Sequence, residues 1–190
     1  MHAASSSQVL YTEPETNYMQ GHMTTDLRNV LRSTFVELIL GTDMKKHINI
    51  VSRFQALPTR AAKKTHISEV SVQENLCLKG LPHDQKLLIA QVALKVADIG
   101  HLCSPCKVHL RWAEQLKEEF FRQGDQERAR NMSISPLMDR GDPAGLVKSQ
   151  VGFFEIVAIP CIRSYCSLFP AAQPMLDGAL ANYEYWRSLK

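Results

Sequence analysis

Two kinds of segment are missing from this 190-residue sequence: a long apolar run, and a cationic N-terminus followed by an apolar core. No stretch approaches the roughly 18 apolar residues that cross a bilayer, and residues 1–24 are polar and aperiodic. The sequence therefore predicts no membrane span, no secretion signal and a cytoplasmic location.

A strong net charge of either sign is also missing. The 22 Lys and Arg residues nearly balance the 19 Asp and Glu residues, which leaves a formal net charge of +3. These charges are scattered rather than gathered into a basic stripe, so we expect no nucleic-acid partner. With 45% apolar residues the chain can build a core, and one globular domain is expected at this length.

The cysteine pattern is incomplete. There are 5 Cys residues, an odd number, and Cys103 and Cys106 form a CxxC pair. A structural zinc site needs four ligands, yet no second CxxC and no nearby His-x-x-x-His completes this pair. We interpret Cys103 and Cys106 as ordinary reduced thiols that flank a helix start at Ser104-Pro105.

Alternation with a period of two is absent over any long stretch, which favours an all-α fold. Residues 1–24 have no apolar period and are predicted to be an irregular arm. Residues 25–190 then form the predicted domain, a compact multi-helix bundle of at least five helices with negligible sheet. Residues 59–70 are basic and polar, and they fit either a loop or a short solvated helix.

Start and stop signals predict where the helices lie. Apolar residues recur at steps of three and four from Thr25 to Phe54, which predicts a long helix with a bend near Gly41. The stop at residue 124 rests on Gln123-Gly124, because glycine commonly ends helices. The other helices are expected at residues 84–98, 104–124, 144–160 with a kink at the final proline, and 174–189.

Asp98 is an acid at the end of a helix that is apolar nearly all round, in the stretch LKVADIGH. Such a helix is expected to be buried, and a buried carboxylate must be paired or must bind a metal. The alternative is a carboxylate that faces water or pairs with a nearby cation. From the residues alone, both interpretations stay open.

Two further placements are unusual. Asp43 and His47 are four residues apart in a helical run, so they share a face and fit either a structural hydrogen bond or a metal shell. Gln150 lies between apolar residues, where its amide suits the edge of a purine and Phe153 suits its face. The alternative for Gln150 is a surface residue beside a core Phe.

Five segments, in this order, resemble the C-terminal half of the catalytic domain of class I cyclic nucleotide phosphodiesterases, an HD-type helical domain. They are ILGTDMKKH, VADIGH, LRWAEQLKEEFFRQGDQER, ISPLMDR and KSQVGFFE, and the likeness extends from about Leu27 to Trp186. One match would carry little weight, whereas five in order are specific. The resemblance implies metal-dependent hydrolysis of cyclic AMP or cyclic GMP in signal transduction, with two divalent metals, zinc and magnesium or manganese.

The resemblance also assigns roles to the unusual residues. It implies that Asp98 is a ligand of the more tightly held metal, usually zinc, and that Thr42 and Asp43 support metal-bound water or the phosphate. The nucleotide-binding residues that it implies are Gln150 on the purine edge, Phe153 on one ring face, Leu116 on the other face and Phe120 nearby. An amide can present either order of donor and acceptor, so the choice between adenine and guanine stays open.

The sequence departs from the family pattern upstream of Thr42. The histidines there, His2 and His22, lie in neither an H-N-x-x-H nor an H-D-x-x-H segment, so the general-acid His and most metal ligands have no counterpart. We therefore expect the isolated chain to hold metal weakly and to be inactive. The alternative is a non-catalytic helical remnant, an interaction or regulatory module that pairs with full-length subunits or forms a homo-oligomer.

Overall fold

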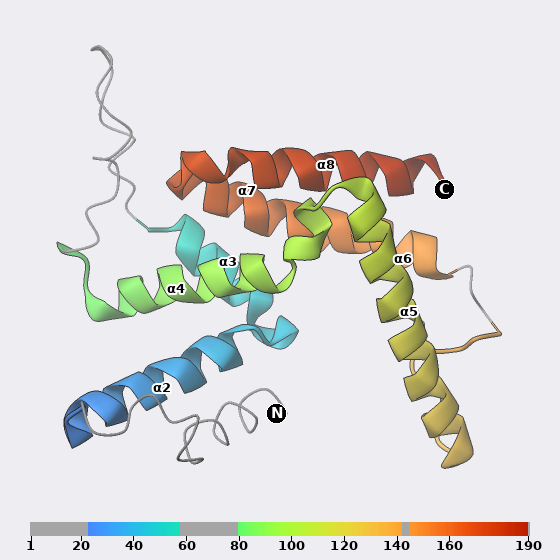
Figure 1. Ribbon diagram of the computed structural model, residues 1–190, viewed down its shortest axis with the longest axis horizontal. Coiled ribbons are helices and arrows are strands. Elements are labelled where there is room, and N and C mark those ends of the chain that lie inside the picture. The colour runs from blue at the N-terminus through green and yellow to red at the C-terminus, as the bar shows by residue number, and fades with distance from the viewer. Residues whose placement is uncertain (1–22, 58–79, 142–144, 190) are drawn as a thin grey trace, which may run out of the picture. The chain divides into compact units, whose positions relative to one another are not determined.

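The computed structural model describes residues 23–57, 80–141 and 145–189, and its contacts divide the chain into two units, Met1–Lys95 and Val96–Lys190 (Figure 1). Every regular element in the described ranges is a helix and none is a strand. The all-α prediction and the expectation of at least five helices are confirmed. The predicted arm, except for Met23 and Thr24, and the segment 59–70 lie outside the described residues.

Unit 1 begins with helix α2, Thr25–Gly41, which Thr24 caps by accepting a hydrogen bond from the backbone N–H of Leu27 at 3.3 Å. The bend predicted near Gly41 is a complete break. Asp43 has an extended backbone, with ψ of 124°, and its carboxylate accepts a hydrogen bond from the N–H of Lys45, which starts the short 3-10 helix η1, Met44–Lys46. Helix α3, His47–Gln55, follows directly.

Helix α4, His83–Asp98, ends at the predicted residue. The core of unit 1 comes from α3 and α4, whose buried apolar side chains are Ile50, Val51, Phe54, Leu88, Ile89 and Val92. Lys95 is buried as well, and its ammonium donates to the carbonyls of Gly41 and Thr42 at 2.9 and 3.2 Å. Because a helix leaves its last carbonyls unpaired, this cation satisfies the end of α2 and holds the break in place.

Unit 2 opens with the 3-10 helix η4, Gly100–Cys103, and helix α5, Cys106–Ala129. The prediction that this helix stops at Gly124 is wrong, because the helix continues for five more residues. Gly124 is buried, and a Cβ atom there would lie 1.9 Å from the carbonyl oxygen of Met138. The glycine permits this close approach of the backbone of the following loop and does not end the helix.

The next helical segment changes its winding before a proline. Helix α6, Gly145–Phe153, passes into a π-helix, η5, Phe154–Ala158, and then into helix α7, Ile159–Leu168. Pro160 has no N–H to donate to the residue four before it, so a change of hydrogen-bond pattern at this place is expected. The kink predicted at Pro160 thus corresponds to a π-helix directly before it.

The same segment contradicts the expectation that no stretch is apolar enough to span a bilayer. The stretch Val147–Leu168 is long and apolar enough to cross a membrane by length and composition, so a run of sufficient hydrophobicity is present after all. A core helix of a soluble protein passes the same test, and Phe154, Ala158, Cys161 and Ile162 of this stretch are completely buried in unit 2.

Helix α8, Gln173–Ser188, closes unit 2 within one residue of the predicted bounds. It runs beside α7 and packs against η4 and α6 (Figure 1). Its buried residues include Leu176, Ala179, Asn182 and Trp186. Spacings of three and four place these residues on one side of the helix, so the side that faces the core is the side that meets η4.

Candidate functional site

Asp98 is exposed at the last turn of α4, contrary to the prediction that its helix is buried all round. In the last turns of α4, Val92 and Val96 are buried while Leu94 and Ala97 are exposed with Asp98. The apolar residues therefore do not mark a fully buried helix, because only one face of it packs. A water-facing carboxylate needs no partner, so burial supplies no argument for a metal at Asp98.

The turn after Asp98 is attached to α8 by three residues spaced four apart. A Cβ atom at Gly178 would lie 2.2 Å from the carbonyl oxygen of Cys103, so the backbones touch there. Asn182 is buried, and its Nδ2 donates to the carbonyls of Leu102 and Ser104, both at 2.8 Å. These contacts fix the position of the residues that follow Asp98.

The third residue, Trp186, is connected to the turn by contacts through two histidines, His109 and His101. Its Nε1 donates to Nε2 of His109 at 2.7 Å, and Nδ1 of His109 lies 3.3 Å from Nδ1 of His101. Burial and the neighbouring His101 ring lower the pKa of His109 to about 4. Burial also lowers the pKa of His101. Sequence reasoning missed His109, because a single histidine in an amphipathic helix carries no distinguishing pattern.

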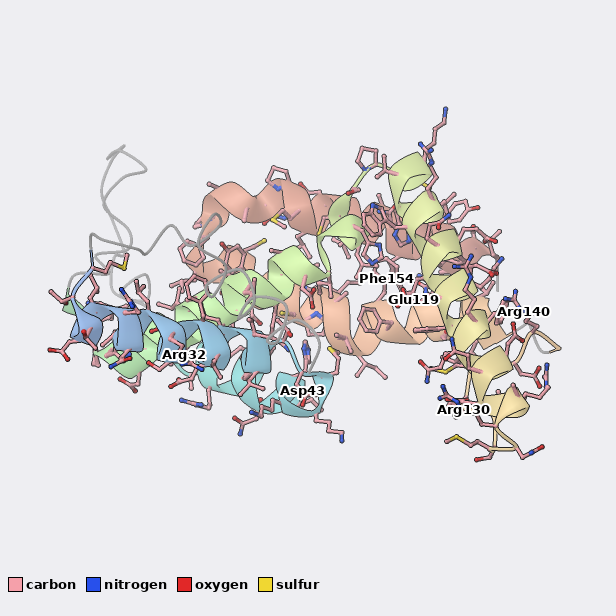
Figure 2. All side chains as sticks on the ribbon, turned by 60° about the horizontal axis from the view of Figure 1, so that its bottom comes forward. Arg32, Asp43, Glu119, Arg130, Arg140 and Phe154 are labelled. Atoms are coloured by element: carbon pink, nitrogen blue, oxygen red, sulfur yellow. The ribbon has the colours of Figure 1, made fainter. Side chains whose placement is uncertain are left out.

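Thr42 and Asp43 lie in unit 1, in the break between α2 and α3, where Figure 2 labels Asp43. The hydroxyl of Thr42 donates to the carbonyl of Ile39 at 2.8 Å, and Asp43 accepts from the N–H of Lys45 at 2.9 Å. The expectation that Asp43 and His47 share one helix face is wrong, because the 3-10 turn between them interrupts the α-helix and leaves Asp43 exposed but His47 buried. Lys95, which sequence reasoning did not single out, holds this break.

Gln150 is only 8% exposed, so the alternative of a surface glutamine is wrong. It lies on α6 beside the buried Val151, and the half-buried Phe153 follows three residues later on the same side of the helix. The buried amide of Gln150 is kept away from bulk water, and the ring of Phe153 is partly accessible. This pair is therefore compatible with a planar polar ligand.

Leu116 and Phe120 form a second pair, one turn apart on α5 and both half-buried. Trp112, one turn earlier, is 58% exposed. The structure thus groups the predicted nucleotide-binding residues as two pairs, each on one helix of unit 2. Thr42 and Asp43, predicted for the phosphate side, belong to the other unit.

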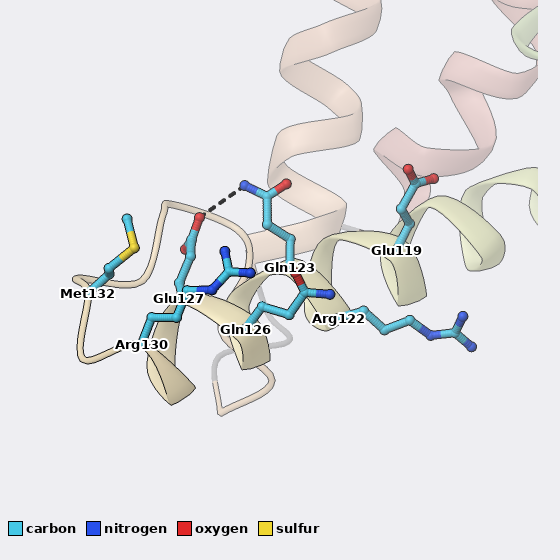
Figure 3. A pocket seen from close by; sticks show the side chains of 7 residues that line it. All are labelled: Glu119, Arg122, Gln123, Gln126, Glu127, Arg130 and Met132. Atoms are coloured by element: carbon cyan, nitrogen blue, oxygen red, sulfur yellow. Dashed lines mark hydrogen bonds between the residues drawn. The ribbon is translucent and has the colours of Figure 1, made fainter. Parts of the chain in front are cut away.

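A depression of about 530 Å³ lies along the C-terminal half of α5 and the start of the loop that follows it, and none of the predicted site residues lines it (Figure 3). Gln123 donates to Glu127 across it at 2.9 Å. Its lining mixes two acids and two cations with uncharged residues: Glu119, Arg122, Gln123, Gln126, Glu127, Arg130 and Met132. This balance of charge favours neither an anionic nor a cationic ligand.

Arg140 ties the loop after α5 to that helix, and Figure 2 shows its side chain beside α5. It forms a two-pronged ion pair with Glu118, at 2.8 and 2.9 Å, and a further bond to Asp125 at 2.8 Å. Its guanidinium also lies 5.2 Å from the ring centre of Phe121. Hydrogen bonds from Arg140 and Arg122 lower the pKa of Glu118 to about 2.

No group of three or more His, Cys, Asp or Glu residues that could hold a metal occurs within residues 23–57, 80–141 and 145–189. Cys103 and Cys106 are free thiols, as predicted. Burial and the neighbouring Cys166 raise the pKa of the Cys103 thiol to about 11. A thiol of that kind is a poor metal ligand, since metals bind the thiolate.

Comparison with protein families places these observations in context. The family model described as 3′5′-cyclic nucleotide phosphodiesterase matches residues 1–179. The chain is 32% identical over 163 residues to a 3′,5′-cyclic-AMP phosphodiesterase, isoform F, of Drosophila melanogaster, and covers 23% of that protein. It is 30% identical over 168 residues to the 3′,5′-cyclic-AMP phosphodiesterase 4C of Mus musculus, again covering 23% of the relative.

Solved structures show the same fold. The structure of LmjPDEB1 in complex with IBMX matches 99% of this chain with a TM-score of 0.79 and 25% identity, over 51% of its own length. The phosphodiesterase domain of the Salpingoeca rosetta rhodopsin phosphodiesterase matches equally well, with a TM-score of 0.79 and 26% identity, over 53% of its length. The chain therefore spans about half of these solved chains and under a quarter of the curated relatives named above.

Proposed function

The chain belongs to the 3′,5′-cyclic nucleotide phosphodiesterase family, and from this membership we propose that it supplies the purine-binding side of a site that hydrolyses cyclic nucleotides to 5′-monophosphates. The family match over residues 1–179 carries this proposal. The relatives named above act on cyclic AMP by their names, but Gln150 is compatible with adenine or guanine.

The purine side of the site is argued from the side chains of α5 and α6. The amide of Gln150, a buried side chain of α6, pairs with the purine edge, and Phe153 stacks on one face of the ring. Leu116 supplies the opposite face, with Phe120 behind it on the same side of α5. An apolar clamp with one oriented amide is the usual composition of a small-molecule site.

The metal side is incomplete in the described residues. Asp98 is the one predicted ligand in them, it is exposed, and no cluster of three ligands surrounds it. A catalytic zinc needs three protein ligands, so the described residues do not fit a bound metal by themselves. We assign Asp98 one ligand position in a site that further residues must complete, and Thr42 and Asp43 a supporting place on the phosphate side.

The test is turnover of cyclic AMP and cyclic GMP by the purified chain with zinc, magnesium or manganese. We expect no turnover above background. The chain should become active when it is joined to the preceding part of the Drosophila catalytic domain, and Asp98→Ala should abolish that activity. The exposed Asp84→Ala, on the same helix, is the matched control and should leave it intact. An inactive but folded fusion, or an active Asp98→Ala fusion, would contradict the proposal.

The alternative function is an interaction or regulatory module, and the exposed apolar side chains of α2 favour it. Leu27, Val30, Val36 and Leu40 are 41 to 53% exposed within unit 1. Leu27 and Val30 lie one turn apart, as do Val36 and Leu40, so they form two exposed apolar pairs. Exposed apolar surface can mark a contact with another protein when it extends into a patch. Sedimentation of the chain alone and with a full-length relative distinguishes the two functions, since co-sedimentation without turnover of the fusion favours the module.

A further inference from the structure

A stripe of charged and amide side chains lines the depression along the C-terminal half of α5 (Figure 3). Its residues recur at steps of three and four, so they share one side of the helix. In chain order they are Glu119, Arg122, Gln123, Gln126, Glu127 and Arg130. All of them are exposed except the half-buried Glu127. We refer to these six residues as the α5 stripe.

The loop after α5 packs mainly on a different side of the helix and leaves most of the α5 stripe open. Arg140 of that loop bonds to Glu118 and Asp125, and neither acid belongs to the stripe. Gly124, which lies against the carbonyl of Met138, is outside the stripe as well. In Figure 1 this half of α5 extends away from α7 and α8. The stripe is therefore accessible along its length.

The order of side chains in the α5 stripe is complementary to its own reverse. The first residue, Glu119, and the last, Arg130, have opposite charges. The second residue, Arg122, and the second from the end, Glu127, also have opposite charges. The two central residues are both Gln, whose amides donate and accept. A second copy that runs antiparallel to the first would place each acid opposite a cation and each glutamine opposite a glutamine.

The two outer charges of the stripe can meet a partner without breaking an existing contact. Both Glu119 and Arg130 are exposed, and within the described ranges neither side chain forms a hydrogen bond or an ion pair. Met132, just beyond the stripe, is 58% exposed. Its N–H donates to the carbonyl of Glu127 at 2.9 Å, which fixes an accessible apolar side chain at this end of the depression.

The two inner charges are held in place and keep bonding capacity. Arg122 uses its Nε–H for Glu118 at 3.1 Å, which leaves its two terminal nitrogens as donors. Glu127 accepts from Gln123 and from the backbone N–H and the hydroxyl of Ser135, at 2.9, 2.7 and 2.9 Å. A carboxylate has about four acceptor positions, so Glu127 can accept one further bond.

We propose that the α5 stripe is the interface of a homodimer, in which two copies of the chain pair antiparallel about a two-fold axis near the midpoint of the stripe. Glu119 then faces the partner's Arg130, and Arg122 faces the partner's Glu127. A two-fold interface uses the same patch on both copies, so each of these ion pairs occurs twice. A ligand with charge of one sign would leave half of the stripe unpaired, whereas a second copy pairs all of it.

The dimer should be weak and sensitive to salt, because exposed ion pairs contribute little individually and are screened. We expect a dissociation constant of roughly 10 µM to 1 mM at low ionic strength, weakened at least about fivefold at ~0.5 M salt. Sedimentation velocity of the full chain over a concentration series measures both. A chain that stays monomeric up to ~1 mM at low salt, or a dimer that salt does not weaken, would overturn the proposal.

Charge reversal tests whether the stripe forms the contact. Glu119→Arg places a cation opposite the partner's Arg130 at both ends of the interface, and it should weaken the dimer at least about tenfold. Glu114→Arg is the matched control, since it makes the same charge change on α5 outside the stripe. Its exposed ion pair with Lys117 contributes little, so the control should change the dissociation constant less than about twofold.

Mixing two variants tests the antiparallel pairing itself. Arg130→Glu alone should also weaken the dimer, but a mixture with Glu119→Arg restores an acid opposite a cation at both ends. That mixture should dimerise about as tightly as the unmodified chain, which also shows that both variants fold. Arg130→Glu mixed with the Glu114→Arg control restores nothing and should stay weaker. Single variants that dimerise like the unmodified chain, or a Glu119→Arg and Arg130→Glu mixture that stays monomeric, would overturn the interface.

Discussion

Two regions of unit 2 carry segments of the family resemblance, and different forces hold them. The turn that follows Asp98 is attached to α8 by buried contacts between uncharged groups, with Asn182 1% exposed and His109 0% exposed. The loop after α5, which contains Arg140, is attached by ion pairs whose side chains are 39 to 55% exposed. We refer to them as the buried turn and the charged loop.

The difference teaches how each region responds to its surroundings. Buried hydrogen bonds are short-ranged and insensitive to salt. They are also costly to break, because the buried groups that lose their partner cannot bond to water instead. Exposed ion pairs are individually weak and are screened by salt. They hold a loop in position only when several of them act together. We therefore expect the buried turn to determine stability and the charged loop to determine local order.

The largest effect is expected from removal of the amide that serves the buried turn. Asn182→Ala leaves the carbonyls of Leu102 and Ser104 without their 2.8 Å donors, and we expect a loss of roughly 2–4 kcal/mol in the free energy of unfolding. Asn29→Ala, an exposed change in the interior of α2, is the matched control and should alter stability by less than about 1 kcal/mol. Urea unfolding measures both, and equal losses would show that the amide of Asn182 is not what holds the turn.

The next effect distinguishes the regions by pH. The pKa of His109 is lowered from 6.5 to about 4 in the folded chain, so the unfolded chain takes up the proton first. The stability from neutral His109 is complete above pH 6.5 and is lost as the pH falls towards 4, by roughly 2–3 kcal/mol. His109→Gln should lose this dependence.

The charged loop should lose stability in a lower pH range than the buried turn. The pKa of Glu118 is lowered to about 2, so its contribution is complete above the usual value of 4.5 and is lost only as the pH falls from there towards 2. Urea unfolding between pH 7.5 and 2.5, compared for the unmodified chain, His109→Gln and Glu118→Gln, separates the windows. A loss in the unmodified chain that begins only below pH 4.5 would contradict the effect ascribed to His109.

A smaller effect is expected from salt, and it should be confined to the charged loop. Arg140→Met removes the bonds to Glu118 and Asp125, and we expect faster amide exchange in residues 130–141 at low ionic strength. At ~1 M salt the screening length is about 3 Å, so the unmodified chain should approach the exchange rates of the variant. Exchange in residues 99–104 should not change, and a similar salt response there would remove the distinction between the regions.

The smallest effect concerns the backbone of the charged loop. Leu137 has a φ of 70°, a left-handed conformation that glycine adopts without strain. Leu137→Gly should therefore raise or preserve the free energy of unfolding, by up to about 1 kcal/mol. Ser133→Gly, at an exposed position of ordinary φ in the same loop, should lower it by about 0.5–1 kcal/mol. Thermal unfolding of the two variants gives opposite signs if Leu137 is strained.

Local pattern determined much of this protein. The period of three and four residues, the stop at Asp98 and the constraint at Pro160 are properties of a few adjacent residues. The structure confirms the start at Thr25 and the end at Asp98, whereas the helix predicted over residues 25–54 is broken after Gly41 and the one predicted over residues 144–160 continues to Leu168. The five ordered segments likewise led to the family, since they depend on residue identity and order alone.

Tertiary structure decided the rest, because burial and hydrogen-bond partners depend on residues that are distant in the sequence. The sequence predicts a helix stop at Gly124, but the structure shows that this glycine makes room for the carbonyl of Met138. The sequence likewise predicts a buried Asp98, but the structure shows that one face of its helix is exposed. His109 carries no pattern at all, and its hydrogen-bond partner Trp186 lies 77 residues further along the chain. Periodicity reports which face of a helix can pack, and only the fold reports what packs against it.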